Sequence, residues 1–311
     1  MIAPWLVAIG AGLASGLLLA LPLSGPGGIL FALLVPLPLF AAGLGLGARG
    51  ATVAGAVLLA LVAIAGGPWP VLGVFLILVG PVWLLVRQAL LSRTASGGNL
   101  EWYPAGLLVT WLTGWGLLWL ALGAFTFAGH PQGMEAGVRE EIQRSLQMLM
   151  PQAPGEQMGR LAGTTAGYAM GASLASWMLL LAVNGALAQG ALVRFGRNLR
   201  PSPELTSLEL PPWLGALPAA AALGYFAPGS IGFLAQNALV VLLVPYFFLG
   251  LAVLHTLARR LTARIPFLVV CYAVMVVFTW PAVLLAGLGL IEQWARLRRR
   301  IEAGGRGKED E

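Results

Sequence analysis

The chain has 311 residues, of which 59% are hydrophobic and only 10% are Asp, Glu, Lys or Arg. A soluble domain carries roughly a quarter of charged residues and needs them to cover its surface, so this composition excludes a water-soluble globular protein. The net charge is +6, and the arginines stand in short gaps between apolar runs, which favours anionic lipid headgroups over nucleic acid as their partner.

Each apolar run is predicted to be an α-helix, because lipid offers no partner to an open sheet edge and the strict alternation of a barrel strand is absent. The first run is predicted to be a retained helix rather than a signal peptide, since it lacks a basic start and further runs follow at once. The sequence therefore predicts an all-α polytopic transmembrane bundle of about nine or ten spans, forming a single domain over residues 1–311. In chain order the runs are 2–23, 29–46, 51–66, 69–86, 103–128, 163–192, 213–228, 232–257, 265–279 and 281–294.

Basic residues are predicted to set the orientation of the bundle. All of them except Arg139, Arg144 and Arg160 lie in loops or in a tail that fall on a single side of the predicted bundle. The positive-inside rule makes that side cytoplasmic and places both termini there. The residues concerned are Arg49, Arg87, Arg93, Arg194, Arg197, Arg200, Arg259, Arg260, Arg264, Arg296, Arg298, Arg299, Arg300, Arg306 and Lys308.

Residues 265–294 allow two interpretations. One long tilted helix would place the basic tail, residues 295–311, outside the cell, against the charge rule. Two short helices broken at Trp280-Pro281 keep the tail inside, and proline tends to end the helix that precedes it. The sequence favours the hairpin of two helices, and it favours a tail that acts as a solvated anchor at the lipid surface.

The longest polar stretch, about 129–162, is predicted to be an extracytoplasmic connector that contains an amphipathic helix. Such a helix either lies in the membrane interface and caps the bundle, or serves as a lid or docking site for a partner. Its apolar face is formed by Met134, Val138, Ile142, Leu146 and Leu149.

Groups that could carry chemistry are sparse in this sequence. No ionisable residue lies in the middle of a predicted span, which disfavours proton relays and voltage sensing. His130 and His255 fall near opposite faces, Cys271 is the single cysteine, and no common hydrolase or nucleotide-binding motif is present. We therefore expect a protein that is not an enzyme and that has no metal or cofactor site.

Uncharged polar and aromatic side chains are the remaining candidates for a solute cavity. Carboxamides inside a span need partners, and they either bond to neighbouring helices or line a cavity. Three tryptophans at four-residue spacing form a stripe that either stacks on a flat ligand or contacts lipid and neighbouring helices. The candidate cavity-lining residues are Asn184, Gln189, Gln236, Asn237, Tyr246, Trp111, Trp115 and Trp119, with His255 as a weaker one.

Small residues at four-residue spacing predict close helix packing. The patterns GxxxG and GxxxGxxxG let two helix backbones approach each other, and they carry no information about a substrate. The residues concerned are Gly12, Gly16, Gly43, Gly47, Gly163, Gly167 and Gly171.

Three stretches in the last hundred residues or so carry a family resemblance. They are LELPPWLGALPAAAALGYF, QNALVVLLVPYFFLGLAVLHTLARR and LLAGLGLIEQWARLRRR. In their order and composition they resemble the YybS-like predicted membrane proteins, the DUF2232 family.

The resemblance implies a bundle that is similar, at the level of fold, to the substrate-binding S components of energy-coupling-factor transporters. In those components small residues of the first helix dock on a transmembrane partner, and Ala8, Gly12 and Gly16 match that spacing. Two functions follow as hypotheses. One is a small-solute binding or transport component that works with partners, and the alternative is a non-transport envelope scaffold that assembles with other membrane proteins. The arginine-rich, lysine-poor usage points to a bacterial inner (cytoplasmic) membrane.

Overall fold

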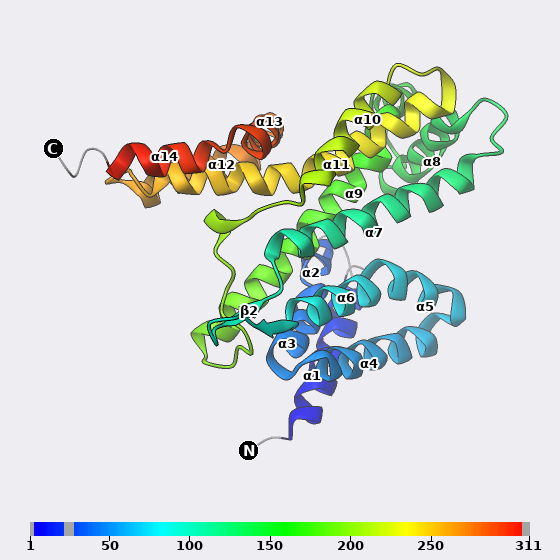
Figure 1. The fold of residues 1–311 in the computed structure, drawn as a ribbon. Coiled ribbons are helices and arrows are strands. Elements are labelled where there is room, and N and C mark those ends of the chain that lie inside the picture. The colour runs from blue at the N-terminus through cyan, green and yellow to red at the C-terminus, as the bar shows by residue number, and fades with distance from the viewer. Residues whose placement is uncertain (1–2, 22–27, 307–311) are drawn as a thin grey trace. The chain divides into compact units, whose positions relative to one another are not determined.

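A computed structural model describes residues 3–21 and 28–306, which are almost entirely helical apart from one short β-hairpin (Figure 1). The predicted all-α membrane class is confirmed. The chain forms two compact units: unit 1 comprises Met1–Leu112 and Leu179–Pro203, and unit 2 comprises Thr113–Met178 and Glu204–Glu311. Helices α7 (Ala105–Phe127) and α9 (Gly155–Arg194) each contribute residues to both units. Lys308 and the other residues of the predicted tail after position 306 lie outside the described residues.

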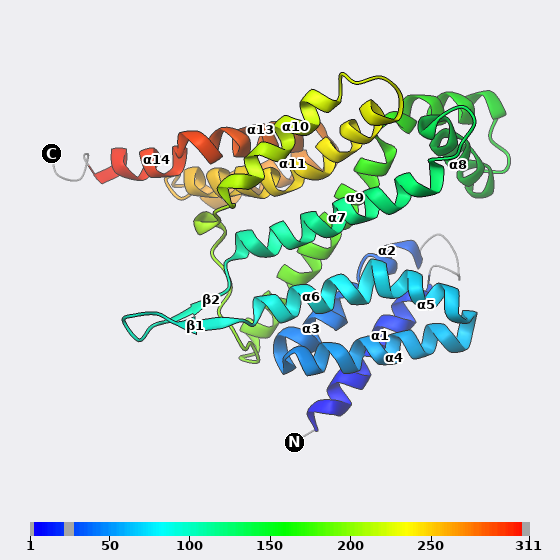
Figure 2. The same cartoon turned by 45° about the vertical axis from the view of Figure 1, so that its right-hand side comes forward.

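Unit 1 is a small helical bundle in which α1, α3 and α4 lie side by side (Figures 1 and 2). Glycines at its corners take positive φ angles, +88° at Gly47 and +79° at Gly67, which lets each following helix start directly after the one before. Its elements are α1 (Pro4–Ala20), α2 (Ile29–Ala32), α3 (Pro36–Leu46), α4 (Ala48–Gly66), α5 (Pro68–Val74), the π-helical turn η3 (Phe75–Val79), α6 (Gly80–Ala89), and the antiparallel strands β1 (Ser92–Thr94) and β2 (Leu100–Trp102).

Close packing in unit 1 depends on α1. A side chain at Gly12 would lie 2.5 Å from the carbonyl oxygen of Ala54, and one at Gly16 would lie 2.5 Å from a methyl of Leu61. Ala8, one turn earlier on the same face, is 1% exposed. The small residues of the first helix therefore face α4 inside unit 1.

Unit 2 is built around α11, which packs against α10 and α13. Among its described elements, α11 carries the largest share of the buried apolar side chains, as expected for a helix that is apolar all round. Besides parts of α7 and α9, its elements are α8 (Met134–Leu149), the 3-10 turns η4 (Leu205–Ser207) and η5 (Pro212–Gly215), α10 (Ala216–Gly224), α11 (Gly229–Ala258), α12 (Arg264–Val277), α13 (Trp280–Ala295) and α14 (Leu297–Arg306).

Fewer helices are long enough to cross a bilayer than the sequence suggested. By length and composition, 5 described helices qualify, or up to 6 if α12 and α13 count together as one bent span. The predicted run 213–228 contains only the nine-residue α10, which at about 1.5 Å per residue covers less than half of the hydrocarbon thickness. The run 29–46 is divided into α2 and α3, and α1 has 17 residues. Prolines and local breaks interrupt runs whose composition alone looks continuous.

The break predicted at Trp280-Pro281 is present. Helix α12 ends at Val277, α13 begins at Trp280 with a proline in its first turn, and the two axes differ by 118°. A single long helix over 265–294 is therefore excluded. The side of the membrane on which the following tail lies stays a prediction.

The amphipathic helix of the connector is α8, which ends at Leu149, just before Pro151. Its apolar face is covered only in part, since Val138 is buried whereas Leu149 is 75% exposed. The second half of the predicted connector is not a loop, because α9 already begins at Gly155.

Candidate functional site

Asn237 on α11 joins two helices of unit 2 through its fully buried carboxamide. Its Oδ1 atom accepts the backbone N–H of Gly171 at 2.7 Å, and its Nδ2 atom donates to the carbonyl of Gly167 at 2.8 Å. A third bond, also 2.8 Å, runs to the carbonyl of Phe233 on its own helix. In a regular α-helix the N–H of Gly171 would donate to that same carbonyl of Gly167, so Asn237 binds both ends of one helical turn of α9.

Replacing Gly171 by alanine is expected to push α9 away from α11. The added methyl would lie 2.6 Å from the carbonyl oxygen of Asn237 and 2.9 Å from Cβ of Val240. Overpacking of this kind costs about 1–3 kcal/mol of unfolding free energy. The melting temperature of the detergent-solubilised protein measures the effect. Gly163→Ala is the matched control, because nothing lies within 4 Å of a side chain there; equal melting temperatures for the two variants would contradict this packing.

Asn184 and Gln189 lie on the part of α9 that belongs to unit 1, and both are buried. Asn184 donates through Nδ2 to the carbonyls of Leu33 and Leu180, at 2.9 and 2.8 Å. Gln189 donates through Nε2 to the carbonyl of Arg200 at 2.8 Å. The Oδ1 atom of Asn184 and the Oε1 atom of Gln189 are buried without a hydrogen-bond partner.

Gln236 and Tyr246 are the candidates on α11. Gln236 is half-buried, with its carboxamide beside Gly167 of α9. Tyr246 is fully buried and its hydroxyl has no hydrogen-bond partner. A side chain added at Gly215 would lie 3.9 Å from that hydroxyl.

The tryptophan stripe on α7 is divided between the two units, because the unit boundary falls within this helix. Trp111 is 44% exposed and donates its indole N–H to the hydroxyl of Tyr103 at 3.0 Å in unit 1. Trp115 and Trp119 are half-buried and belong to unit 2. The predicted cavity residues are thus divided between the two units: Asn184, Gln189 and Trp111 in unit 1, and Gln236, Asn237, Tyr246, Trp115 and Trp119 in unit 2.

The most extensive polar cluster in unit 2 is centred on an ion pair that the sequence analysis did not anticipate. Glu292 is 5% exposed, and its carboxylate accepts the Nε–H of Arg298 at 2.8 Å. The same guanidinium donates through Nη1 to the carbonyl of Thr206 and through Nη2 to that of Leu208, at 2.6 and 2.7 Å. Arg298, expected to be a solvated member of the basic tail, is instead mostly buried and holds α14 against the segment 205–208.

A residue in the left-handed backbone conformation brings Arg298 close to Glu292. Arg296 has φ 48°, and among the described residues no other non-glycine residue has a positive φ. The turn brings the backbone N–H of Arg298 to within 3.1 Å of Oε2 of Glu292, so both the backbone and the side chain of Arg298 bind this carboxylate. We call Glu292, Arg298, Thr206 and Leu208 the C-terminal clamp.

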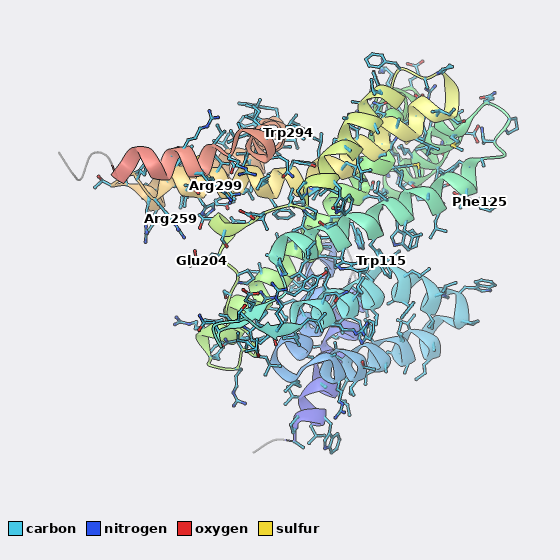
Figure 3. All side chains as sticks on the ribbon, in the orientation of Figure 1. Trp115, Phe125, Glu204, Arg259, Trp294 and Arg299 are labelled. Atoms are coloured by element: carbon cyan, nitrogen blue, oxygen red, sulfur yellow. The ribbon has the colours of Figure 1, made fainter. Side chains whose placement is uncertain are left out.

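Two exposed ion pairs lie near the C-terminal clamp in sequence, and Figure 3 labels three of their four side chains, Glu204, Arg259 and Arg299. Arg259, just after α11, pairs with Glu204 at 3.6 Å, and Arg299 pairs with Glu209 at 3.5 Å. These side chains are more than half exposed, so each pair contributes little to stability compared with the buried one.

The stretches that carry the family resemblance meet in this part of unit 2. Trp294 lies against Gly215 of the PPWLG turn, at 3.2 Å from a side chain added there. Gln293 points its amide nitrogen at the carbonyls of Leu210 and Pro211, at 3.5 and 3.4 Å. The shared sequence pattern therefore describes one three-dimensional neighbourhood.

Two glycines of these stretches make the closest helix contact found at any described glycine. A side chain at Gly250 of α11 would lie 1.9 Å from the carbonyl oxygen of Leu285, and one at Gly289 of α13 would lie 1.9 Å from that of Tyr246. Only a residue without a side chain permits this approach. The sequence signal that could have predicted this contact is a glycine inside an apolar helix, because such a glycine usually allows close packing of a neighbouring helix.

Unit 1 also contains a buried charge. It belongs to Arg200, which was predicted to lie in a loop. Arg200 is 6% exposed, donates through Nη1 to the carbonyl of Ala89 at 2.7 Å, and lies over the ring of Trp102 at 5.7 Å. Its own carbonyl accepts bonds from Gln189 and Asn198. Burial lowers the pKa of the Arg200 guanidinium, but arginine stays protonated at physiological pH.

The long apolar helices, the internally bonded carboxamides and the glycine crossings define a multi-pass helical integral membrane protein. The family model described as "Predicted membrane protein (DUF2232)" matches residues 12–292, and the chain belongs to this family. The resemblance predicted from the C-terminal stretches is thereby confirmed. No curated protein and no solved structure matches the chain.

Proposed function

We propose that this protein is a non-enzymatic scaffold of a bacterial inner membrane, which acts by assembling with other integral membrane proteins. The observation that carries the proposal is the use of its buried polar groups. The carboxamide of Asn237 makes three hydrogen bonds, of which two join α9 to α11 and the third stays within α11. The buried charges Glu292, Arg298 and Arg200 bind groups of their own unit and hold backbone segments in place there.

Helix α12 supports an assembly role. It is apolar along its length, yet none of its residues is buried within the described chain. Val276 is 86% exposed and Val269 is 60% exposed. Such a helix needs cover from lipid or from another membrane protein, and a scaffold would offer it to a partner.

A small-solute binding component is the second candidate, and a specific observation favours it. Among the described residues, three buried side-chain oxygens have no hydrogen-bond partner: Oδ1 of Asn184, Oε1 of Gln189 and the hydroxyl of Tyr246. Buried polar atoms are almost always satisfied, so a solute or a water would complete them. Two of the three, those of Asn184 and Gln189, belong to unit 1.

The two functions are distinguished by crosslinking in living cells. A photoreactive amino acid at Val276 is expected to capture a discrete membrane protein, identified by mass spectrometry, whereas the same group at Val241, which is fully buried, captures none. If Val276 and Val269 both yield lipid adducts alone, while a small molecule co-purifies at one per chain and is lost in Asn184→Leu, the scaffold is wrong and solute binding takes its place.

A further inference from the structure

The charged side chains of unit 1 are distributed unevenly. Its sequence contains six arginines, one glutamate and no lysine or aspartate. The single glutamate, Glu101, pairs with Arg93 across the β-hairpin at 2.8 Å, so unit 1 keeps five unbalanced positive charges. We call the six arginines the arginine rim: Arg49, Arg87, Arg93, Arg194, Arg197 and Arg200.

Contacts inside unit 1 bring the elements that carry the arginine rim to one end. Gly45, near the end of α3, lies against Leu192 and the carbonyl of Arg197, just beyond α9. The guanidinium of Arg200 binds the carbonyl of Ala89, the last residue of α6. The ends of α3, α6 and α9 therefore lie together, with the hairpin following directly from α6 (Figure 2).

The start of α4 joins the same end. Trp83 of α6 donates its indole N–H to Thr52 in the second turn of α4 at 3.0 Å, and Arg87 lies over the ring of Trp83 at 5.6 Å. Arg49 precedes Thr52 by less than one turn. Every charged side chain of unit 1 is thus found at one end of it.

The segment after α9 gives the arginine rim its shape. Gly196, with φ +62°, closes the helix, and the N–H of Arg197 donates to the carbonyl of Leu192 at 2.8 Å. Buried Arg200 fixes the other end of the segment. Arg194 and Phe195, just before Gly196, and Arg197, just after it, are all exposed, Phe195 at 74%.

We propose that the arginine rim binds the phosphate headgroup of an anionic phospholipid, with Arg194 and Arg197 as the principal contacts. A guanidinium matches phosphate oxygens in a two-bond geometry, and five uncompensated charges favour an anion strongly over a zwitterion. The exposed ring of Phe195 beside these arginines suits the boundary between headgroups and acyl chains. A lipid fits this mixture better than a free anion, which would leave the ring in water. The inference does not depend on the scaffold role.

Native mass spectrometry of the delipidated, full-length protein tests the proposal. Phosphatidylglycerol is titrated against phosphatidylcholine with the same acyl chains. Wild-type protein is expected to retain phosphatidylglycerol preferentially, and Arg194→Gln/Arg197→Gln is expected to bind it about 25-fold more weakly, at roughly fivefold per basic residue. Binding of phosphatidylcholine should not change.

Arg139→Gln/Arg144→Gln is the matched control, because it also removes two exposed arginines, but from α8, where each is paired with a glutamate. It is expected to bind phosphatidylglycerol as wild type does. Equal losses in both double variants, or no preference for phosphatidylglycerol in the wild type, would overturn the proposal. Displacement of the lipid by millimolar inorganic phosphate would also overturn it, in favour of a site for the free anion.

Discussion

Gly289→Ala is expected to force α11 and α13 apart and to lower the unfolding free energy by about 3 kcal/mol, the upper end of the usual range for overpacking. The reason is geometric. A methyl group at this position would lie 1.9 Å from the carbonyl oxygen of Tyr246 and 2.8 Å from the backbone nitrogen of Gly250. Both atoms belong to the backbone of a helix, so neither can turn aside as the end of a flexible side chain would. The thermal midpoint of the protein in detergent, followed by loss of the monodisperse peak, measures the effect.

The control for this variant is the glycine two residues earlier on the same helix. Gly287→Ala adds the same methyl to α13, where nothing lies within 4 Å. Because alanine favours helix over glycine by about 1 kcal/mol, this variant is expected to be neutral or slightly more stable than wild type. If Gly287→Ala and Gly289→Ala melt at the same temperature, the close crossing of α11 and α13 is wrong.

Arg298→Met is expected to cost about 3–5 kcal/mol, the range seen when one partner of a buried ion pair is removed. The substitution keeps most of the side-chain volume but leaves the carboxylate of Glu292 buried without its counter-charge. It also leaves the carbonyls of Thr206 and Leu208 without their donor. We expect a lower melting temperature and early proteolysis near the α13–α14 junction, detectable by limited trypsin digestion and mass spectrometry.

Two further variants separate the C-terminal clamp from a general effect of charge. Arg299→Gln removes the neighbouring arginine, whose pair with Glu209 is exposed on both sides, and should change stability by less than about 1 kcal/mol. Glu292→Leu combined with Arg298→Met should be more stable than Arg298→Met alone, because no buried charge is left unpaired. Strictly additive losses in the double variant would show that the two side chains do not interact.

The helical membrane class could be predicted from the sequence because it depends on composition, which needs no knowledge of contacts. The number of spans could not, because composition does not reveal where an apolar run is interrupted. Residues 213–228 look like one span, but the helix there is limited to Ala216–Gly224, between the 3-10 turn at Pro212 and the turn at Tyr225. The hairpin after Val277 was predictable because Pro281 gave a local signal.

The candidate site was harder to predict because it depends on long-range contacts. Glu292 lies close to the end of an apolar run, where a carboxylate would normally reach water, but it is buried and paired with Arg298, which in turn binds the distant segment 205–208. Arg298 is one of several arginines in a row, and nothing local separates it from Arg299 or Arg300. Gly250 and Gly289 fall outside the GxxxG spacing on which the packing prediction was based. They were nevertheless part of the stretches that identified the family.

The joint made by Asn237 has a consequence for how α9 and α11 can come apart within unit 2. Breaking an interhelix bond in lipid normally leaves backbone groups stranded, since no water can replace the lost partner. Here the carbonyl of Gly167 and the N–H of Gly171, which Asn237 binds, are also helical partners of each other along α9, so both keep a partner when the side chain withdraws. Separation of α9 from α11 at this point therefore exposes one carboxamide to the bilayer and no unpaired backbone group of α9.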